Sequence, residues 1–242
     1  MQRLSANQFK NLKKQKRENR FLLFLDNVKI IKDAISNGVK PQLVLLESDS
    51  AYQDTFSGYP ILIASRKEIE ALSDSKTPQG VVCVAEYIQN VVKKPNSNFL
   101  VLDGLQDPGN VGTLIRTATA CGFENIFLLE CAHVTNSKVV RSSVGTIFQS
   151  KIYEMSRDEF AKKAKEWDLT LYKADMDGEN LFSAKFEKVC GVVIGNEGQG
   201  VSDKISALCK KALSLPMKKG VESLNASISG AIIMYQIAKD NF

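Results

Sequence analysis

The 242-residue sequence predicts an α/β protein of two domains. A small α/β domain is expected over residues 1–97, and a parallel sheet with helices on both faces over residues 98–242. Short apolar runs suited to buried strands alternate with segments of helical periodicity along the whole chain. The polar segment 93–98, Lys-Lys-Pro-Asn-Ser-Asn, separates two strand-like runs and marks the predicted domain boundary. Hydrophobic residues make up 44% of the chain and charged residues 24%, which suits a globular protein with a substantial core.

The N-terminal domain is predicted to open with a basic helix or arm over residues 5–20 and a buried strand at 21–25. A helix follows with Val28, Ile31 and Ile35 on one face. Asn37-Gly38 supplies the left-handed cap that commonly ends such a helix. The remaining predictions for this domain are strands at 43–46, 61–63 and 81–84 and a short helix around 69–72.

The C-terminal domain shows strict alternation of strand and helix, which predicts a parallel sheet covered on both faces. The predicted strands lie at 99–102, 126–129, 151–153, 170–174, 191–194 and 212–215. The predicted helices lie at 112–121, 139–147, 158–167, 202–210 and 225–239. Ligands of such sheets bind at the carboxyl ends of the strands, so polar segments at those ends are the first place to look for chemistry.

The net charge of +5 lies entirely in the first domain. Residues 1–97 carry 15 Lys and Arg against 10 Asp and Glu, whereas residues 98–242 carry 17 of each. Within residues 1–20, Glu18 is the one acid among seven basic residues: Arg3, Lys10, Lys13, Lys14, Lys16, Arg17 and Arg20. This concentration favours binding to a polyanion, although a solvated helix face or a basic tail produces the same pattern.

Several classes of protein are disfavoured by what the sequence lacks. Its apolar runs are far shorter than the ~20 residues that span a bilayer, and the N-terminus has no apolar signal core, so a cytoplasmic protein is expected. Five cysteines without a CxxC pair predict reduced core thiols and no metal site. His133 is the single histidine, which leaves at most one candidate base for a Ser-His triad and more often indicates a structural residue.

Three polar segments follow predicted strands and differ from core sequence. Residues 102–112 form a Gly- and Pro-containing turn in which Asn110 can cap a helix that carries Arg116. Residues 194–200 contain three glycines and Glu197, and residues 215–227 lead into the last helix. No segment fits a P-loop or the dinucleotide fingerprint, which disfavours a nucleoside triphosphatase. The residues alone support a glycine-lined polar cleft beside a basic module that faces RNA or DNA.

Taken in order, these segments resemble the three motifs of the SpoU family of RNA ribose 2′-O-methyltransferases, within the SPOUT superfamily. The matching runs are NVGTLIRTATACGF from Asn110, IGNEGQGVS from Ile194, and LPMKKGVESLNASISGAI from Leu215. Thr77-Pro78-Gln79-Gly80 and the basic start resemble the accessory RNA-binding domain of the family. The family's Val-Glu-Gly is missing near residues 25–27. The resemblance implies a homodimer and a deep C-terminal trefoil knot, which the ordinary rules of chain topology would not predict.

The resemblance also assigns roles to individual residues. It implies S-adenosylmethionine as the cofactor and no metal, because the sulfonium is already a strong methyl donor. The implied cofactor contacts are Leu128, Gly195, Asn196, Gly198, Leu215, Met217, Ser223, Leu224 and Ser227. The implied catalytic residues are Asn110, Arg116, Glu197, Ser223 and Asn225. RNA contacts are expected from Lys10, Lys13, Lys14, Lys16, Arg17, Arg20 and Arg116.

Arg116 is expected to anchor phosphate and to stabilise charge on the developing alkoxide, since a guanidinium with a pKa above ~12 is a poor base. The predicted function is therefore 2′-O-methylation of a ribose in structured RNA, with ribosomal RNA of the 23S type favoured over transfer RNA. Two alternatives stay open. One is an RNA-binding protein of the same fold without catalysis, and the other is a superfamily methyltransferase that modifies a base.

Overall fold

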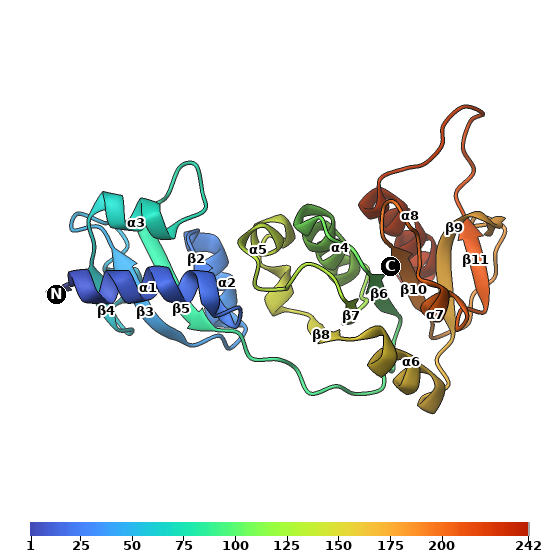
Figure 1. The fold of residues 1–242 in the computed structure, drawn as a ribbon, viewed down its shortest axis with the longest axis horizontal. Coiled ribbons are helices and arrows are strands. Elements are labelled where there is room, and N and C mark those ends of the chain that lie inside the picture. The colour runs from blue at the N-terminus through green and yellow to red at the C-terminus, as the bar shows by residue number, and fades with distance from the viewer. Residues whose placement is uncertain (242) are drawn as a thin grey trace. The chain divides into compact units, whose positions relative to one another are not determined.

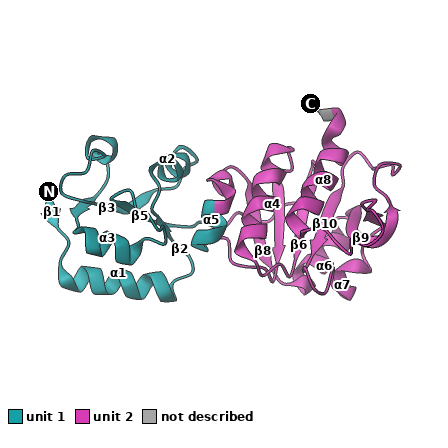
Figure 2. Ribbon diagram, turned by 90° about the horizontal axis from the view of Figure 1, so that it is seen from above, with its two compact units in different colours: residues 1–88, 135–141 teal, residues 89–134, 142–242 magenta. Residues whose placement is uncertain are grey.

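The computed structural model describes residues 1–241, and these form two compact units, coloured separately in Figure 2. Unit 1 comprises residues 1–88 and 135–141, and unit 2 comprises residues 89–134 and the described chain from residue 142 onward. The division lies closer to the N-terminus than the expected boundary after residue 97. Contacts of the intervening segment explain this, because Asn90 donates to the carbonyl of Ile152 at 3.4 Å and Asn98 accepts from the backbone N–H of Cys190 at 3.0 Å.

Unit 2 is built on a six-stranded sheet in which all neighbours are parallel (Figure 1). The strand order is β11-β9-β10-β6-β7-β8. The strands are β6 (Phe99–Asp103), β7 (Asn125–Leu129), β8 (Lys151–Met155), β9 (Leu171–Asn180), β10 (Gly191–Gly195) and β11 (Lys211–Ser214). All six predicted strands are present, and the predicted parallel sheet is confirmed.

Helices cover both faces of this sheet (Figure 2). The helices from residue 108 onward are α4 (Pro108–Ala120), α5 (Ser137–Ser143), α6 (Arg157–Glu166), α7 (Asp203–Ser206) and α8 (Ala226–Ala238), with short 3-10 turns at Thr146–Phe148 and Lys239–Asn241. Alternate strand residues such as Val101 and Phe127 pack with Phe160 of α6 and Ile205 of α7. The opposite face carries α4 and α8, which pack so closely that a Cβ on Gly230 would lie 2.4 Å from Leu114.

Strict alternation of strand and helix is wrong at two places in unit 2. No helix lies between β9 and β10, which are joined by residues 181–190. The helix predicted at 202–210 is reduced to the single turn α7, because the backbone N–H of Lys210 already bonds to the Leu171 carbonyl as the chain enters β11. The other four predicted helices of the domain are present, with the one at 139–147 divided into α5 and a 3-10 turn.

Unit 1 is a smaller α/β structure with a mixed five-stranded sheet of order β1-β4-β3-β5-β2. Its strands are β1 (Gln2–Arg3), β2 (Leu22–Leu25), β3 (Pro41–Leu46), β4 (Ile61–Ile63) and β5 (Val81–Glu86), and β5 runs antiparallel to both of its neighbours. The helices are α1 (Ala6–Glu18), α2 (Val28–Ser36) and α3 (Arg66–Leu72), with a 3-10 turn at Asp54–Phe56. Leu12 of α1 and Ile69 of α3 share one core cluster with strand residues, so α1 is part of the folded unit.

None of the helices that the structure describes is both long and apolar enough to cross a membrane.

Candidate active site

The three polar segments singled out from the sequence meet at the carboxyl edge of the unit 2 sheet. The first follows β6 and opens α4, the second follows β10, and the third follows β11 and opens α8. Strands β6 and β10 are hydrogen-bonded neighbours, with Gly195 paired to Asp103 at the ends of the two strands. Parallel pairing therefore brings the first two segments together, and packing of α8 on α4 adds the third.

A continuous chain of side-chain hydrogen bonds links these segments. The Nδ2 of Asn110 donates to Oε1 of Glu197 at 2.7 Å, and the Nδ2 of Asn225 donates to Oδ1 of Asn110 at 3.1 Å. The Oδ1 of Asn225 accepts from the backbone N–H and hydroxyl of Ser227 at 2.9 and 2.6 Å. Asn110 is 8% exposed, and both the nitrogen and the oxygen of its amide make hydrogen bonds to other side chains. Four predicted site residues therefore form one polar unit.

Asn110 reaches this position because it does not cap α4, and the expectation that it would do so is wrong. Asp107 is the N-cap, with its carboxylate accepting from the backbone N–H groups of Gly109 and Asn110, and Pro108 occupies the first turn. The helix thus begins earlier than predicted. Asn110 stands inside the first turn with its side chain directed at Glu197 and Asn225.

Arg116 does not join this unit. Asn110 is buried whereas Arg116, six residues further along α4, is exposed to solvent. Six residues rotate a helix by about 240°, which places the two side chains on different faces. No hydrogen bond or ion pair joins Arg116 to any residue in the described part of the chain.

The loop after β10 is folded back on itself. The backbones of Asn196 and Gly200 exchange hydrogen bonds of 3.0 and 2.9 Å. The Oδ1 of Asn196 accepts from the backbone N–H groups of Gly198 and Gln199, and its Nδ2 donates to the Gly104 carbonyl at 3.0 Å. A Cβ on Gly195 would lie 2.2 Å from the carbonyl carbon of Gly200, so glycine is required here by the loop's own backbone.

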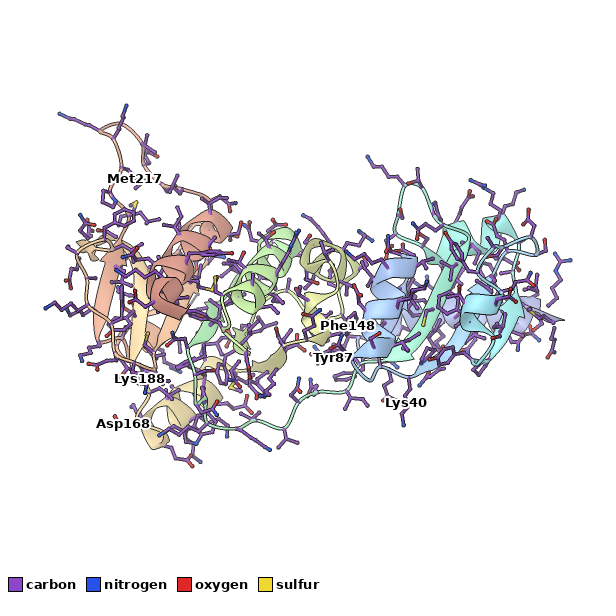
Figure 3. All side chains as sticks on the ribbon, turned by 180° about the vertical axis from the view of Figure 1, so that it is seen from behind. Lys40, Tyr87, Phe148, Asp168, Lys188 and Met217 are labelled. Carbon is purple, nitrogen blue, oxygen red and sulfur yellow. The ribbon has the colours of Figure 1, made fainter. Side chains whose placement is uncertain are left out.

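The expected cofactor contacts are divided between the sheet edge and an extended loop. Leu128 is buried in β7, Gly195 ends β10, and Asn196 and Gly198 belong to the folded loop after that strand. The loop between β11 and α8, which includes Met217, extends away from the sheet (Figure 3). It also carries Leu215, Ser223 and Leu224; Leu215 and Met217 are half-buried, whereas Ser223 and Leu224 are exposed.

The basic residues expected to contact RNA lie on and just after α1. Lys10, Lys13, Lys14, Arg17 and Arg20 are exposed. Lys16 differs, because its Nζ donates to the Leu72 carbonyl at 2.7 Å and lies 2.9 Å from Oδ1 of Asp74, with 19% of the side chain exposed. Lys16 therefore fixes α1 within unit 1, and its ammonium is not presented to a ligand as the sequence had suggested.

The cysteines do not offer nucleophiles at this edge. All five thiols are free, and burial raises the pKa of Cys131 to about 12 although it lies near the Leu105 and Gly104 backbone. At neutral pH this thiol is protonated. Among residues 1–241 no group of three or more Asp, Glu, His and Cys side chains is placed to hold a metal ion.

Sequence reasoning missed two further features of this edge, one on each face of the sheet. Asp103, at the end of β6, binds Arg157 and Ser202, and Gly230 allows α8 to approach α4. Asp103 lies within the first polar segment, and a carboxylate that ends an otherwise apolar strand is the one signal that could have drawn attention to it.

The fold and this site define an α/β protein whose candidate ligand-binding edge is built from three loops at the carboxyl ends of a parallel sheet. Residues 97–235 match the SpoU rRNA Methylase family, and the chain belongs to that family. The resemblance inferred from the three motifs is thereby confirmed, and with it the class of enzyme, an RNA methyltransferase.

Two relatives show the extent of the similarity. The chain is 25% identical over 228 residues to the 23S rRNA (guanosine(2553)-2′-O)-methyltransferase RlmP of Bacillus subtilis, covering 93% of this chain and 91% of the relative. It is 30% identical over 188 residues to an uncharacterized tRNA/rRNA methyltransferase of Synechocystis, covering 74% of this chain and 68% of the relative. The first match includes both compact units.

Solved structures share the fold. The SpoU methyltransferase AviRb from Streptomyces viridochromogenes, in complex with AdoMet, matches with a TM-score of 0.88 at 22% identity over 98% of each chain. A putative RNA methyltransferase of the TrmH family from Porphyromonas gingivalis matches with a TM-score of 0.87 at 25% identity, covering 98% of this chain and 99% of that one. The fold of each unit is thus a known one.

Proposed function

We propose that this protein transfers a methyl group from S-adenosylmethionine to a ribose 2′-hydroxyl of structured RNA, with ribosomal RNA as the favoured substrate. The observation that carries the proposal is the hydrogen-bonded unit of Glu197, Asn110, Asn225 and Ser227, which joins all three motif segments. The Bacillus relative that matches over nearly its whole length is named as a 23S rRNA 2′-O-methyltransferase, which supports the same reaction and favours ribosomal over transfer RNA.

The residues at the sheet edge fit this cofactor. Leu215 and Met217, just after β11, are half-buried and offer apolar surface for an adenine, while Asn196 and Ser227 supply polar atoms nearby in the same edge. When bound, S-adenosylmethionine supplies an activated methyl group on a sulfonium. The AdoMet complex of AviRb, which has the same fold, supports the choice of cofactor.

In the proposed mechanism, this chain aligns the groups that react. Asn110 offers both a donor and an acceptor, held by Glu197 and Asn225, and so is placed to orient the ribose hydroxyl. Glu197 fixes the Asn110 rotamer, and Asn225 caps α8 through its bonds to the backbone N–H groups of Ser227 and Ile228. Arg116 is proposed to bind a phosphate and to stabilise the developing alkoxide.

We also propose that the protein acts as a homodimer. Unit 2 exposes apolar side chains on and beside α8, including Ile228 at 51%, Tyr235 at 50% and Phe182 at 60% exposure. Phe182, Ile232 and Tyr235 line a hollow of about 430 Å³ on this surface. A second copy covering the surface would bury it. Arg116, which is exposed on α4, would then be available to the site of the other copy.

The proposal includes the C-terminal trefoil knot and the division of labour between the units. The knot is supported by the position of β10 between β9 and β6, and by the packing of α8 against α4 at Gly230. Unit 1, with its exposed basic residues on α1, is proposed to select the RNA by shape and phosphate contacts. We place the protein in the cytoplasm, where it meets its RNA substrate.

The proposed function is tested by incubating the protein with unmodified total RNA and S-adenosylmethionine labelled in the methyl group. The RNA is then digested to nucleosides and analysed by mass spectrometry. A labelled 2′-O-methylnucleoside that Arg116→Ala does not produce is the expected result. A labelled base would support the base-methylating alternative, and cofactor binding without any labelled product from free or ribosomal RNA would favour the silent RNA-binding protein.

A further inference from the structure

A buried carboxylate on the opposite face of the sheet has no part in the proposed reaction. Asp103, the last residue of β6, is 1% exposed. Its Oδ1 accepts from Nε of Arg157 at 2.6 Å, and its Oδ2 accepts from both the backbone N–H and the hydroxyl of Ser202, each at 2.7 Å. A carboxylate this deeply buried requires charged or hydrogen-bonding partners, and here three donors supply them.

The cationic partner of Asp103 is itself fixed in place. Arg157 is the first residue of α6, and its guanidinium also pairs with Glu130 after β7. Gly104 has a positive φ of +73°, and a Cβ there would lie 2.7 Å from a terminal nitrogen of Arg157. The arginine thus packs against bare backbone beside Asp103. Its hydrogen bond to Asp103 raises the pKa of Arg157, so the guanidinium stays charged.

The second partner, Ser202, ends the glycine-rich loop that carries Glu197. The loop is attached at both of its ends to the β6 turn. Asn196 donates to the Gly104 carbonyl at 3.0 Å at its beginning, and Ser202 donates to Asp103 at its end. Glu197 lies between these two attachments and accepts from Asn110 at 2.7 Å. The position of Glu197 therefore depends on where the two ends of the loop are held.

We propose that Asp103 is a positioning residue for the methyl-transfer site. Through Ser202 it holds the loop of residues 195–201 in the conformation that brings Glu197 to Asn110, and the Arg157 pair holds Asp103 in turn. This role rests on the proposed function, because Glu197 and Asn110 are the groups that the loop aligns. Asp103 acts on them only through the loop, which separates positioning from catalysis.

The direct test is Asp103→Asn, which preserves size and removes the charge. In the variant an amide nitrogen replaces one carboxylate oxygen. This nitrogen is a donor, so it cannot accept the hydrogen bond from whichever partner it faces, Arg157 or Ser202, and that contact is lost. Amide hydrogen exchange, followed by mass spectrometry on the full-length protein, should show about 10-fold or faster exchange in peptides covering residues 195–202. Asp158→Asn is the matched control, since this carboxylate lies one residue after Arg157, is 81% exposed and pairs with Lys204 at the surface.

Turnover supplies a second readout that a general loss of stability would not reproduce. In Asp103→Asn the kcat for RNA methylation is expected to fall about 10- to 100-fold, while the Kd for RNA stays within about 2-fold of the wild type. An equal effect on RNA binding and turnover, or unchanged exchange of residues 195–202, would overturn the positioning role.

Ser202→Ala keeps the inference testable if Asp103→Asn fails to fold. This variant removes one hydroxyl donor and leaves both the backbone N–H bond and the Asp103–Arg157 pair in place. Faster exchange confined to the loop supports the proposal, and unchanged exchange contradicts it. Hydrogen exchange is measured without RNA or turnover. If the protein methylated no RNA, the proposed function would be refuted, and the exchange data would still show whether Asp103 holds the loop.

Discussion

Gly195, the last residue of β10, and Gly198, in the loop that follows, differ in the space that a side chain would find. A Cβ on Gly195 would approach backbone atoms of Gly200 and Val201 to 2.2–2.3 Å, and backbone cannot move aside without unfolding the loop. A Cβ on Gly198 would have its nearest neighbour, Oδ1 of Asn196, at 3.6 Å.

We therefore expect Gly195→Ala to abolish cofactor binding or to weaken it at least about 100-fold, since overpacking of this kind typically costs about 1–3 kcal/mol or more. Gly198→Ala is the matched control and should bind within about 3-fold of the wild type. Isothermal titration calorimetry with S-adenosylmethionine measures both. Equal affinities for the two variants would show that the loop adapts to a side chain at residue 195.

Asn110 is the central residue of the site because it uses both atoms of its amide. Asn110→Asp replaces the donor to Glu197 with an oxygen, so two carboxylates would face each other at the 2.7 Å now spanned by a hydrogen bond. We expect the rate of methyl transfer to fall about 100-fold or more, which corresponds to ~2.7 kcal/mol of lost stabilisation.

The rate should recover in part at acidic pH, because protonation of one member of the new carboxylate pair removes the repulsion between them. A pH profile of single-turnover methyl transfer tests this prediction, with the thermal midpoint of each variant as the folding control. A flat profile, parallel to that of the wild type, would contradict the hydrogen bond between Asn110 and Glu197.

The sequence could identify the residues of the proposed site that belong to motifs, but not the residues on the other face of the sheet. Asn110, Glu197 and Asn225 belong to motifs, so the resemblance identified them directly. Asp103, Arg157 and Ser202 come together across separations of 54 and 99 residues. Such contacts depend on strand order, on which the local sequence pattern carries no information.

At the scale of single elements, α1 combines two roles that composition alone could not separate. Leu12 is buried, and Phe9 packs against the same core, while Lys10, Lys13 and Arg17 face solvent. Truncation of residues 1–20 would remove part of the core of unit 1 along with the charge. Substitution of exposed residues is therefore the cleaner test of RNA binding.

A variant in which Lys10, Lys13, Lys14 and Arg17 are all changed to Gln should weaken RNA binding and flatten its dependence on salt. The slope of log K against log salt should decrease by about 0.7–0.9 for each phosphate that the variant no longer neutralises. Fluorescence anisotropy with labelled RNA at several salt concentrations measures this. An unchanged slope would show that α1 does not bind the phosphates, and unchanged cofactor affinity is the expected control.

The ion pair between Lys16 and Asp74 should make the stability of unit 1 depend on pH. Burial acts to raise the pKa of Asp74, but hydrogen bonds from Lys16 and Ser137 and the charges of Lys16 and Arg141 together outweigh it and hold the pKa below its usual value of 3.8. A carboxyl group with a lowered pKa stabilises the folded state above its unfolded pKa, and this contribution disappears as the pH falls through the folded pKa.

Asp74→Asn should therefore lower the thermal midpoint of the protein at pH 7, and the difference from the wild type should shrink as the pH falls below 3.8 and through the lower folded pKa. Circular dichroism melts from pH 7 into that acidic range provide the measurement, with the exposed Asp54→Asn as the control. A difference that persists at the acidic pH would assign the effect to packing of Asp74 rather than to its charge.

Buried strands were predicted more accurately than exposed ones. The six strands of unit 2 were recognisable because a parallel sheet covered on both faces needs nearly continuous apolar runs, such as Phe99–Asp103 and Asn125–Leu129. The connection between β9 and β10 was not recognisable, since β9 continues through Asp175 to Asn180 with half-buried and exposed residues. Polar sequence at the end of a strand resembles a loop, and only pairing with β11 makes it a strand.

At the scale of the whole molecule, the strand order of the unit 2 sheet is the feature that the sequence did not predict. Alternation indicated a parallel sheet and left its order open. The observed order places β10 between β9 and β6, which brings the loop bearing Glu197 beside the loop bearing Asn110. The proposed active site therefore depends on two strands that are far apart in sequence and are neighbours in the sheet.

The proposed dimer links the role of Arg116 to the apolar surface of α8. Arg116 lies on a different face of α4 from Asn110, so a single chain does not present it to the hydrogen-bonded unit. If a second copy covers α8, loss of the dimer should remove turnover while leaving the unit of Asn110, Glu197 and Asn225 intact. Ile228→Lys, at a residue that is 51% exposed, introduces a charge that would be buried in that interface.

Ile228→Lys should sediment as a monomer at micromolar concentration and lose methyl transfer. Val91→Lys should behave as the wild type, since this residue is 78% exposed and is not among those that line the hollow beside α8. Mixing Ile228→Lys with Arg116→Ala should not restore activity, because a monomeric chain cannot supply its Arg116 to another chain.

Mixing Arg116→Ala with Asn110→Ala, both of which retain the interface, should restore up to about one quarter of wild-type turnover if Arg116 acts on the other copy. No recovery in that mixture would mean that each chain uses its own arginine, and the face on which Arg116 lies would then require α4 to move during the reaction.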